Sequence, residues 1–241
     1  MKTIASDYTA ACGWHGKLPT VGDFAERRLP PEFIEPWDAW LSEGLECLRE
    51  QPAWLDAYLA SPSWRFLLMP DALAPGAAAW VGVLMPSVDR VGRYYPLTLA
   101  HRIEALPANA TQVDALWSWL LALDEAAADA LRDDWSIEQL EAELQRLGPP
   151  PQGDMRIDAR RATTSMCANP LHRFPLAGHR HAAALLASQA AGLWLEATRG
   201  RTFWYADSGL SEPCLLCSTA PDAGLAASLL GMKVDNADIA A

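Results

Sequence analysis

The sequence predicts an α/β (α+β) fold in which helices pack on a mainly antiparallel or mixed central sheet. Two observations support this prediction. Apolar residues with helical spacing occur near the N-terminus and again after residue 110, and short apolar runs bounded by proline and glycine lie between them. Of the 241 residues, 51% are apolar and 20% are charged, so the chain can bury a substantial core. This composition excludes disordered, collagen-like and coiled-coil chains.

The first elements are expected to be a strand and two helices. The run 13–19 places bulky residues beside glycines, which predicts a strand followed by a loop with a turn at 19–23. After Pro30-Pro31, the apolar residues of 33–48 fall on one face of a 3.6-residue period. They predict an amphipathic helix with an acidic outer face. A second, short helix is expected at 54–59.

Three strands are expected next. Residues 64–69, 79–85 and 94–100 form short apolar runs between proline and glycine residues. Short loops between consecutive strands favour antiparallel pairing. Pro96 has no N–H to donate, so it indicates an edge or bulge position for the third strand.

Helical spacing returns at 116–131 and 137–147, where Ser136 can cap the second helix. We interpret the proline-rich run 148–153 as a surface loop, because the piece that follows it has too few strands for a core of its own. Residues 1–241 are therefore expected to form a single domain.

The C-terminal part is expected to contain a β-hairpin, a short strand and a closing helix. Residues 192–197 and 202–206 flank a tight connection, which predicts the hairpin. Leu215-Leu216 indicates a short strand. Residues 222–230 are expected to form the closing helix, and they are followed by Gly231, a residue typical of helix ends.

Charge and cysteine content limit the function classes. With 19 Lys and Arg against 30 Asp and Glu, the net charge is −11, so no nucleic acid partner is expected. Asp7 interrupts the segment where a signal peptide would be apolar, and the uncharged runs 72–88 and 182–195 are broken by polar residues or proline. No membrane insertion is expected. Five scattered cysteines fit a reducing cytoplasm.

The cysteines also allow a metal-dependent hydrolase as an alternative. Cys214 and Cys217 have the spacing of a zinc-binding pair, but no second tight pair is present and Leu215-Leu216 resembles a strand interior. The residues that could complete such a site are Cys167, His172, His179 and His181. We instead interpret the cysteines as buried and inert, and expect no metal and no cofactor.

No enzyme motif is visible. The sequence has no glycine-rich phosphate loop, nucleophile elbow or His-Glu-x-x-His pair, so we do not expect catalysis. The hydroxyl groups of Thr163, Thr164 and Ser165 could accept phosphate beside Arg160 and Arg161. A solvated polar turn is the simpler interpretation of this segment.

Two loops, 17–24 and 86–93, combine charge and glycine beside proline. Arginine forks suit carboxylate or phosphate groups, and aspartates can pair with them or accept backbone N–H groups in turns. Either an ion-paired network joins the two loops, or they bind a partner. The candidate residues are Lys17, Gly22, Asp23, Asp89, Arg90, Gly92 and Arg93.

At these loops the sequence resembles the TagF family of type VI secretion-associated proteins. Four blocks carry the resemblance, in family order: GWHGKLPTVGDF (13–24), PWDAWL (36–41), SPSWRF (61–66) and GVLMPSVDRVGRYYPL (82–97). The motif-bearing part is 13–100, whereas 101–231 is read from general architecture alone.

The resemblance implies a cytoplasmic bacterial protein that represses type VI secretion after translation. It implies non-catalytic binding to a forkhead-associated scaffold protein, a three-layer α/β/α sandwich, and a partner-binding role for the seven candidate residues. An assembly adaptor of the same system is the alternative, and the oligomeric state is not predicted. Four tryptophans on apolar faces are expected in the core, namely Trp37, Trp40, Trp64 and Trp80.

Overall fold

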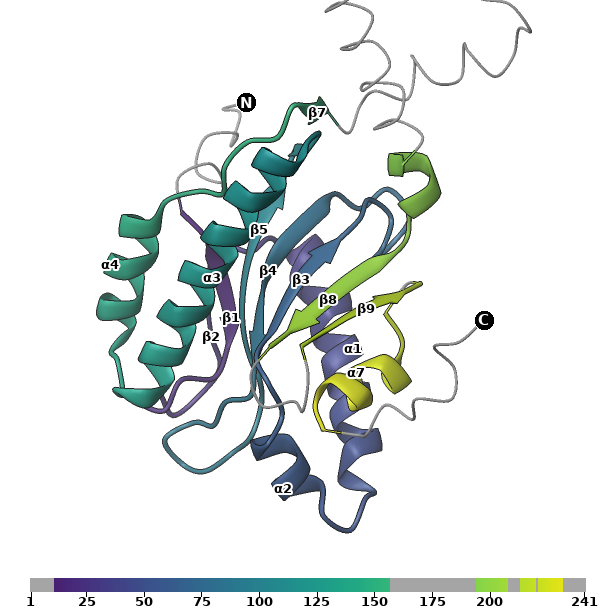
Figure 1. The fold of residues 1–241 in the computed structure, drawn as a ribbon. Helices are drawn as coiled ribbons and strands as arrows, with labels where there is room; N and C mark the ends of the chain where they lie inside the picture. The colour runs from purple at the N-terminus through teal and green to yellow at the C-terminus, as the bar shows by residue number, and fades with distance from the viewer. Residues whose placement is uncertain (1–10, 157–193, 208–212, 220, 232–241) are drawn as a thin grey trace, which may run out of the picture.

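The computed structural model describes residues 11–156, 194–207, 213–219 and 221–231 (Figure 1). Its centre is a seven-stranded sheet with the order β2-β1-β5-β4-β3-β8-β9, in which every neighbouring pair is antiparallel. The strands are β1 Gly13–Gly16, β2 Ala25–Arg27, β3 Trp64–Leu68, β4 Ala79–Met85, β5 Leu97–Ile103, β8 Thr202–Ala206 and β9 Cys214–Ser218. The mainly antiparallel sheet expected from the short loops is confirmed. A separate small sheet pairs β6 Ala105–Leu106 with β7 Met155–Arg156.

Helices lie on both sides of the large sheet, with α3 and α4 on one side and α1 and α7 on the other (Figure 1). The helices are α1 Pro31–Arg49, α2 Trp54–Leu59, α3 Ala110–Arg132, α4 Ile137–Leu147 and α7 Ala223–Leu229. These five were expected from the sequence, whereas a further short helix at 194–198 was not. Ser136 caps α4 in a capping box with Gln139. No helix in the described ranges combines the length and the apolarity that a bilayer crossing requires.

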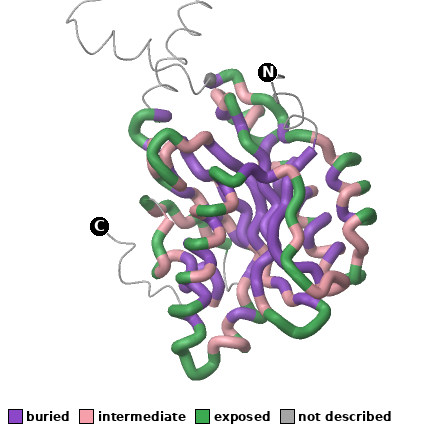
Figure 2. Tube along the Cα trace, turned by 180° about the vertical axis from the view of Figure 1, so that it is seen from behind, coloured by how far each residue is buried: buried purple, intermediate pink, exposed green. Residues whose placement is uncertain are grey.

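Two hydrophobic clusters form the core, one on each side of the sheet. Their buried residues run through the central strands and the inner helix faces (Figure 2). The four tryptophans expected in the core are all at most 5% exposed. Trp80 lies on β4, the strand that leads into the loop 86–93, so this loop leaves a well-packed support.

The prediction of a hairpin formed by 192–197 and 202–206 is wrong. Residues 194–198 form a short helix in which the Thr198 hydroxyl donates to the carbonyl oxygen of Trp194, at 2.8 Å. β8 pairs with β3 and β9 instead. A six-residue apolar run does not distinguish helix from strand, because both bury such a run equally well.

The third expected strand begins three residues later than predicted, at Leu97, and lies between β1 and β4 rather than at an edge. Pro96 precedes it, so its missing N–H removes no hydrogen bond from the ladder. The expectation of an edge or bulge at Pro96 is therefore wrong. β2 was not expected, and Leu215-Leu216 lies inside the longer strand β9.

Candidate functional site

The loops 17–24 and 86–93 lie side by side because β1 pairs with β5 and β5 pairs with β4. The backbone N–H of Arg90 donates to the carbonyl of Val21 at 3.1 Å. The Ser87 hydroxyl donates to the carbonyl of Lys17 at 2.7 Å. The structure thus brings all seven sequence-predicted residues to one end of the sheet.

A buried ion pair joins the two loops. The Lys17 Nζ atom lies 2.6 Å from Asp89 Oδ2, and the two side chains are 4% and 0% exposed. Asp89 Oδ1 accepts the backbone N–H groups of Val91 and Arg93. Burial alone would raise the pKa of Asp89, but the bonds from Lys17 and Arg93 hold it well below its ordinary range. Lys17 and Asp89 therefore hold the loops together and do not face solvent.

The other five candidate residues lie at the surface of the two loops. Arg93 donates through Nε to Asp89 at 2.7 Å and through Nη2 to the carbonyl of Gly22. Its Nη2 atom also lies 3.8 Å from Asp23 Oδ1. Gly92 adopts a φ of +83°, a left-handed conformation that favours glycine at this turn. Arg90 and Asp23 are exposed. The ion-paired network expected as one interpretation is present, and it leaves an exposed charged surface above it.

A groove of about 720 Å³ adjoins the loops and was missed by the sequence reasoning. One wall is α1, with Asp38 and Glu46, and the other holds Phe24 and Tyr94. The Tyr95 hydroxyl donates to Asp38 Oδ1 at 2.6 Å. Burial and the nearby Asp38 raise the pKa of Tyr95 above its ordinary value. The acidic face of the helix at 33–48 was the one sequence signal for this groove. Nothing in the sequence indicated that this face lies beside the loop 86–93.

His15 lies in the floor of this groove, with its side chain only 7% exposed. Its Nε2 atom is 3.5 Å from Asp38 Oδ1. Its Nδ1 atom has no hydrogen-bond partner among the described residues, and Glu26 Oε2 is 3.6 Å away. The ring stacks near Phe24 at a centroid distance of 5.9 Å.

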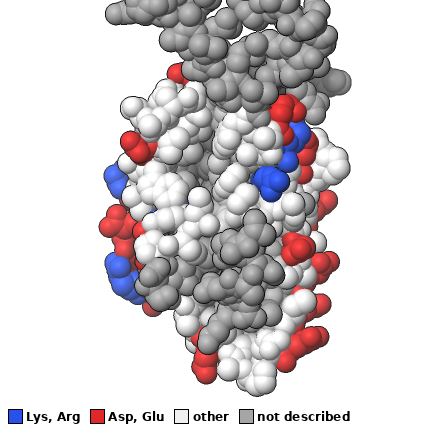
Figure 3. Space-filling model, turned by 45° about the vertical axis from the view of Figure 1, so that its right-hand side comes forward, with Lys and Arg blue, Asp and Glu red and all other residues white. Residues whose placement is uncertain are grey.

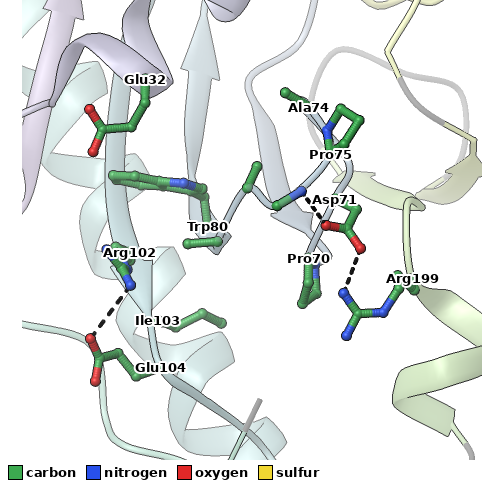
Figure 4. A pocket seen from close by; sticks show the side chains of 13 residues that line it. Glu32, Pro70, Asp71, Ala74, Pro75, Trp80, Arg102, Ile103, Glu104 and Arg199 are labelled. Atoms are coloured by element: carbon green, nitrogen blue, oxygen red, sulfur yellow. Dashed lines mark hydrogen bonds and ion pairs between the residues drawn. The ribbon is translucent and has the colours of Figure 1, made fainter. Parts of the chain in front are cut away.

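A second cavity, of about 710 Å³, lies at the other end of β4, where Trp80 forms part of the wall (Figure 4). Four of its charged side chains form two ion pairs. Arg199 Nη1 donates to Asp71 at 2.5 Å, and Arg102 lies 3.8 Å from Glu104. The Arg199–Asp71 pair ties the segment before β8 to the loop after β3, which is a structural role.

The geometry of β9 argues against the metal-dependent hydrolase. Cys214 and Cys217 are three residues apart on a strand, so their side chains point to opposite faces and cannot share one ion. The described residues contain no group of three or more potential metal ligands. The other members of the suggested site, Cys167, His172, His179 and His181, lie outside the described residues, as do Thr163, Thr164 and Ser165.

The expectation that the cysteines are buried is correct only in part. Cys12 is buried, and burial raises the pKa of its thiol. Cys47 and Cys217 are exposed, which corrects the prediction. Cys47 lies on the outer face of α1, between buried positions of the helix pattern.

Comparisons with known proteins agree with the motifs of the two loops. The family model that describes the TagF N-terminal domain, type VI secretion system-associated, matches residues 13–147, more than half of the chain. The crystal structure of PA0076 from Pseudomonas aeruginosa PAO1 at 2.05 Å resolution is similar, with 31% identity and a TM-score of 0.69 over 92% of this chain and 94% of that chain. No curated protein matches. The chain belongs to the TagF family of type VI secretion system-associated proteins.

Proposed function

We propose that this protein is a post-translational negative regulator of bacterial type VI secretion that acts in the cytoplasm. It binds a component of the machinery, the forkhead-associated scaffold protein, and makes or breaks no covalent bond. Membership of the TagF family supports this proposal. The observation that carries the binding step is the exposed charged surface that a buried Lys17–Asp89 pair holds in place.

The candidate residues divide into two roles. Lys17 and Asp89 fix the loops from inside, and Gly92 allows the turn. Arg90 and Asp23 present charge to the partner, since their side chains are exposed. A rim of fixed charges favours encounter and orientation more than raw affinity. We further infer a three-layer α/β/α sandwich formed by one domain over 1–241, with helices on both sides of one sheet.

Charge reversal at Arg90 tests the binding surface. Arg90→Glu removes an exposed positive side chain whose neighbours in the buried network stay in place. We expect capture of the purified scaffold protein to weaken by roughly fivefold or more. Export of effectors in cells is expected to rise toward that of a deletion strain. The measurements are a pull-down with purified proteins and an assay of secreted effector.

Arg146→Glu is the matched control, because Arg146 is exposed on α4 and, among the residues that the structure describes, pairs only with Glu143. It should bind and repress like the wild type. Equal binding by Arg90→Glu and the wild type would contradict the role of this surface. If deletion of the gene lowers export instead of raising it, the assembly adaptor replaces the repressor.

A further inference from the structure

The groove beside the candidate loops is long enough to hold an extended peptide. Its α1 wall runs from Ile34 to Arg49, and fifteen helical steps of 1.5 Å span about 22 Å. An extended chain advances about 3.3 Å per residue, so roughly six residues fit along this wall. A single small molecule would fill only part of such a site.

The wall opposite α1 is aromatic. Phe24 is 47% exposed, and Trp54 and Tyr94 meet edge to face at a centroid distance of 6.0 Å. Aromatic faces attract cations, and two cations of this chain already lie over the rings of this wall. The guanidinium of Arg49 lies 5.6 Å from the Trp54 ring, and Lys17 Nζ lies 4.5 Å from the Phe24 ring.

The carboxylates of the α1 wall are less well compensated than the cations of the loops. Lys17 and Arg93 both bond Asp89, and Arg93 also lies near Asp23. Across the groove, Asp38 takes its bonds on Oδ1 alone, and its Oδ2 atom has no partner within the described residues. Its side chain is 46% exposed.

Glu46 continues this acidic wall two turns further along α1, and its side chain has no hydrogen bond or ion pair within the described ranges. Other acidic side chains extend the same helix face outside the groove. Figure 3 shows acidic side chains gathered down the side of the molecule where α1 lies. On the α1 wall two carboxylates, those of Asp38 and Glu46, stand against one cation, Arg49, so this wall is net negative. Negative charge that faces aromatic rings suits a guanidinium better than a carboxylate or a phosphate.

We propose that this groove binds an extended segment of the partner through an arginine side chain. The guanidinium would donate to Asp38 Oδ2 and lie against Phe24, whose ring centroid is 4.8 Å from that of Tyr95, the residue bonded to Asp38. The rest of the segment would continue along the groove toward Tyr94 and Trp54. The Tyr95–Asp38 hydrogen bond holds the accepting carboxylate in position before the partner arrives. This inference rests on the proposed function, because it assigns the partner's segment to the groove that the candidate loops border.

The probe is N-acetyl-L-arginine amide, with N-acetyl-L-citrulline amide as its neutral analogue of the same shape. The readout is the backbone N–H resonance of Phe24 in the ¹⁵N-labelled full chain, assigned from triple-resonance spectra. We expect a saturable shift with arginine and none with citrulline. Asp38→Asn keeps an acceptor for Tyr95 but loses the charge, so it should weaken arginine binding by roughly tenfold or more.

Glu43→Gln is the matched control, because Glu43 is exposed on α1 but does not line the groove. It should titrate like the wild type. An equal response to citrulline, no saturable shift, or unchanged binding by Asp38→Asn would each overturn the arginine site.

Capture of the purified scaffold protein separates this inference from the proposed function. If Asp38→Asn loses both arginine binding and scaffold capture, the partner binds in the groove. If it loses arginine binding alone, the partner binds elsewhere and the assignment of the groove is wrong. The proposed regulatory function is then unaffected. If the wild type captures no scaffold protein, the proposed function fails whatever the arginine titration shows.

Discussion

A single carboxylate, that of Asp89, organises the candidate site. It accepts hydrogen bonds from Lys17, from the Arg93 guanidinium and from two backbone N–H groups. Because its side chain is 0% exposed, these bonds replace all of its hydration. Removing the charge would leave the Lys17 ammonium buried without a full partner. The loops that carry Arg90 and Asp23 therefore depend on the ionisation of a residue that no partner can touch.

We expect this dependence to appear in acid unfolding. The folded-state pKa of Asp89 is depressed below its ordinary value of 3.8, so its contribution to stability is present above that value. It is lost as the pH falls from there toward the folded-state pKa. Asp89→Asn should be less stable than the wild type at pH 7, and the gap in urea midpoint should narrow below about pH 4.

Asp114→Asn is the control for this series, since Asp114 is an exposed aspartate on α3. Its urea midpoint should follow the wild type at every pH. A gap for Asp89→Asn that stays constant from pH 7 to pH 3 would contradict a charged Asp89 in the folded protein.

At the scale of elements, the sequence predicted those whose burial leaves a periodic pattern. α1 buries one face from Phe33 to Leu48, and α4 begins with a capping box, so both carry local signals. The hairpin prediction at 192–197 failed because a short apolar run is ambiguous. β2 has three residues, of which two are exposed, so it leaves almost no pattern.

The candidate site shows the same limit. The two loops could be found because each carries its own motif. The groove could not, because Asp38 and Tyr95 are 57 residues apart and meet only when α1 packs beside the loop before β5. Local spacing does not encode such a contact. The placement of β8 beside β3 is equally non-local.

The crossing of α1 and α7 gives a prediction for these two helices. A Cβ atom on Gly44 would lie 2.2 Å from the Cβ of Ala226 and 3.1 Å from the N atom of Ala227. Gly44→Ala gains about 1 kcal/mol of helix propensity. The overlap forces the helices apart, so we expect a net loss of about 2 kcal/mol in the free energy of unfolding, measured in urea.

Two variants test the cause of that loss. Glu43→Ala raises the helix propensity at an exposed neighbouring position of α1, so it should not destabilise the protein. The double variant Gly44→Ala/Ala226→Gly removes the overlapping Cβ atom from the other helix and should recover part of the loss. A stabilising Gly44→Ala would show that the helices do not pack this closely.

At the scale of the whole molecule, segments far apart in the sequence complete one core. β8 lies directly beside β3, and Trp204 in it is fully buried. Its ring centroid is 5.3 Å from that of Phe66 and 6.0 Å from that of Trp37. The cluster on the α1 side of the sheet therefore needs a side chain from beyond the proline-rich loop 148–153, although the family model ends at residue 147.

Truncation at this loop tests whether the N-terminal part folds without β8, β9 and α7. A fragment of residues 11–153 would expose the edge of β3 and the aromatic side chains that Trp204 covers. Exposed edges and aromatic surface favour aggregation, so we expect an insoluble fragment or one without cooperative urea unfolding. A fragment of residues 11–231 keeps β8, β9 and α7, and it should unfold like the full chain. Cooperative unfolding of the 11–153 fragment would instead divide the molecule into two domains at the loop, and would place the candidate site in a unit that folds by itself.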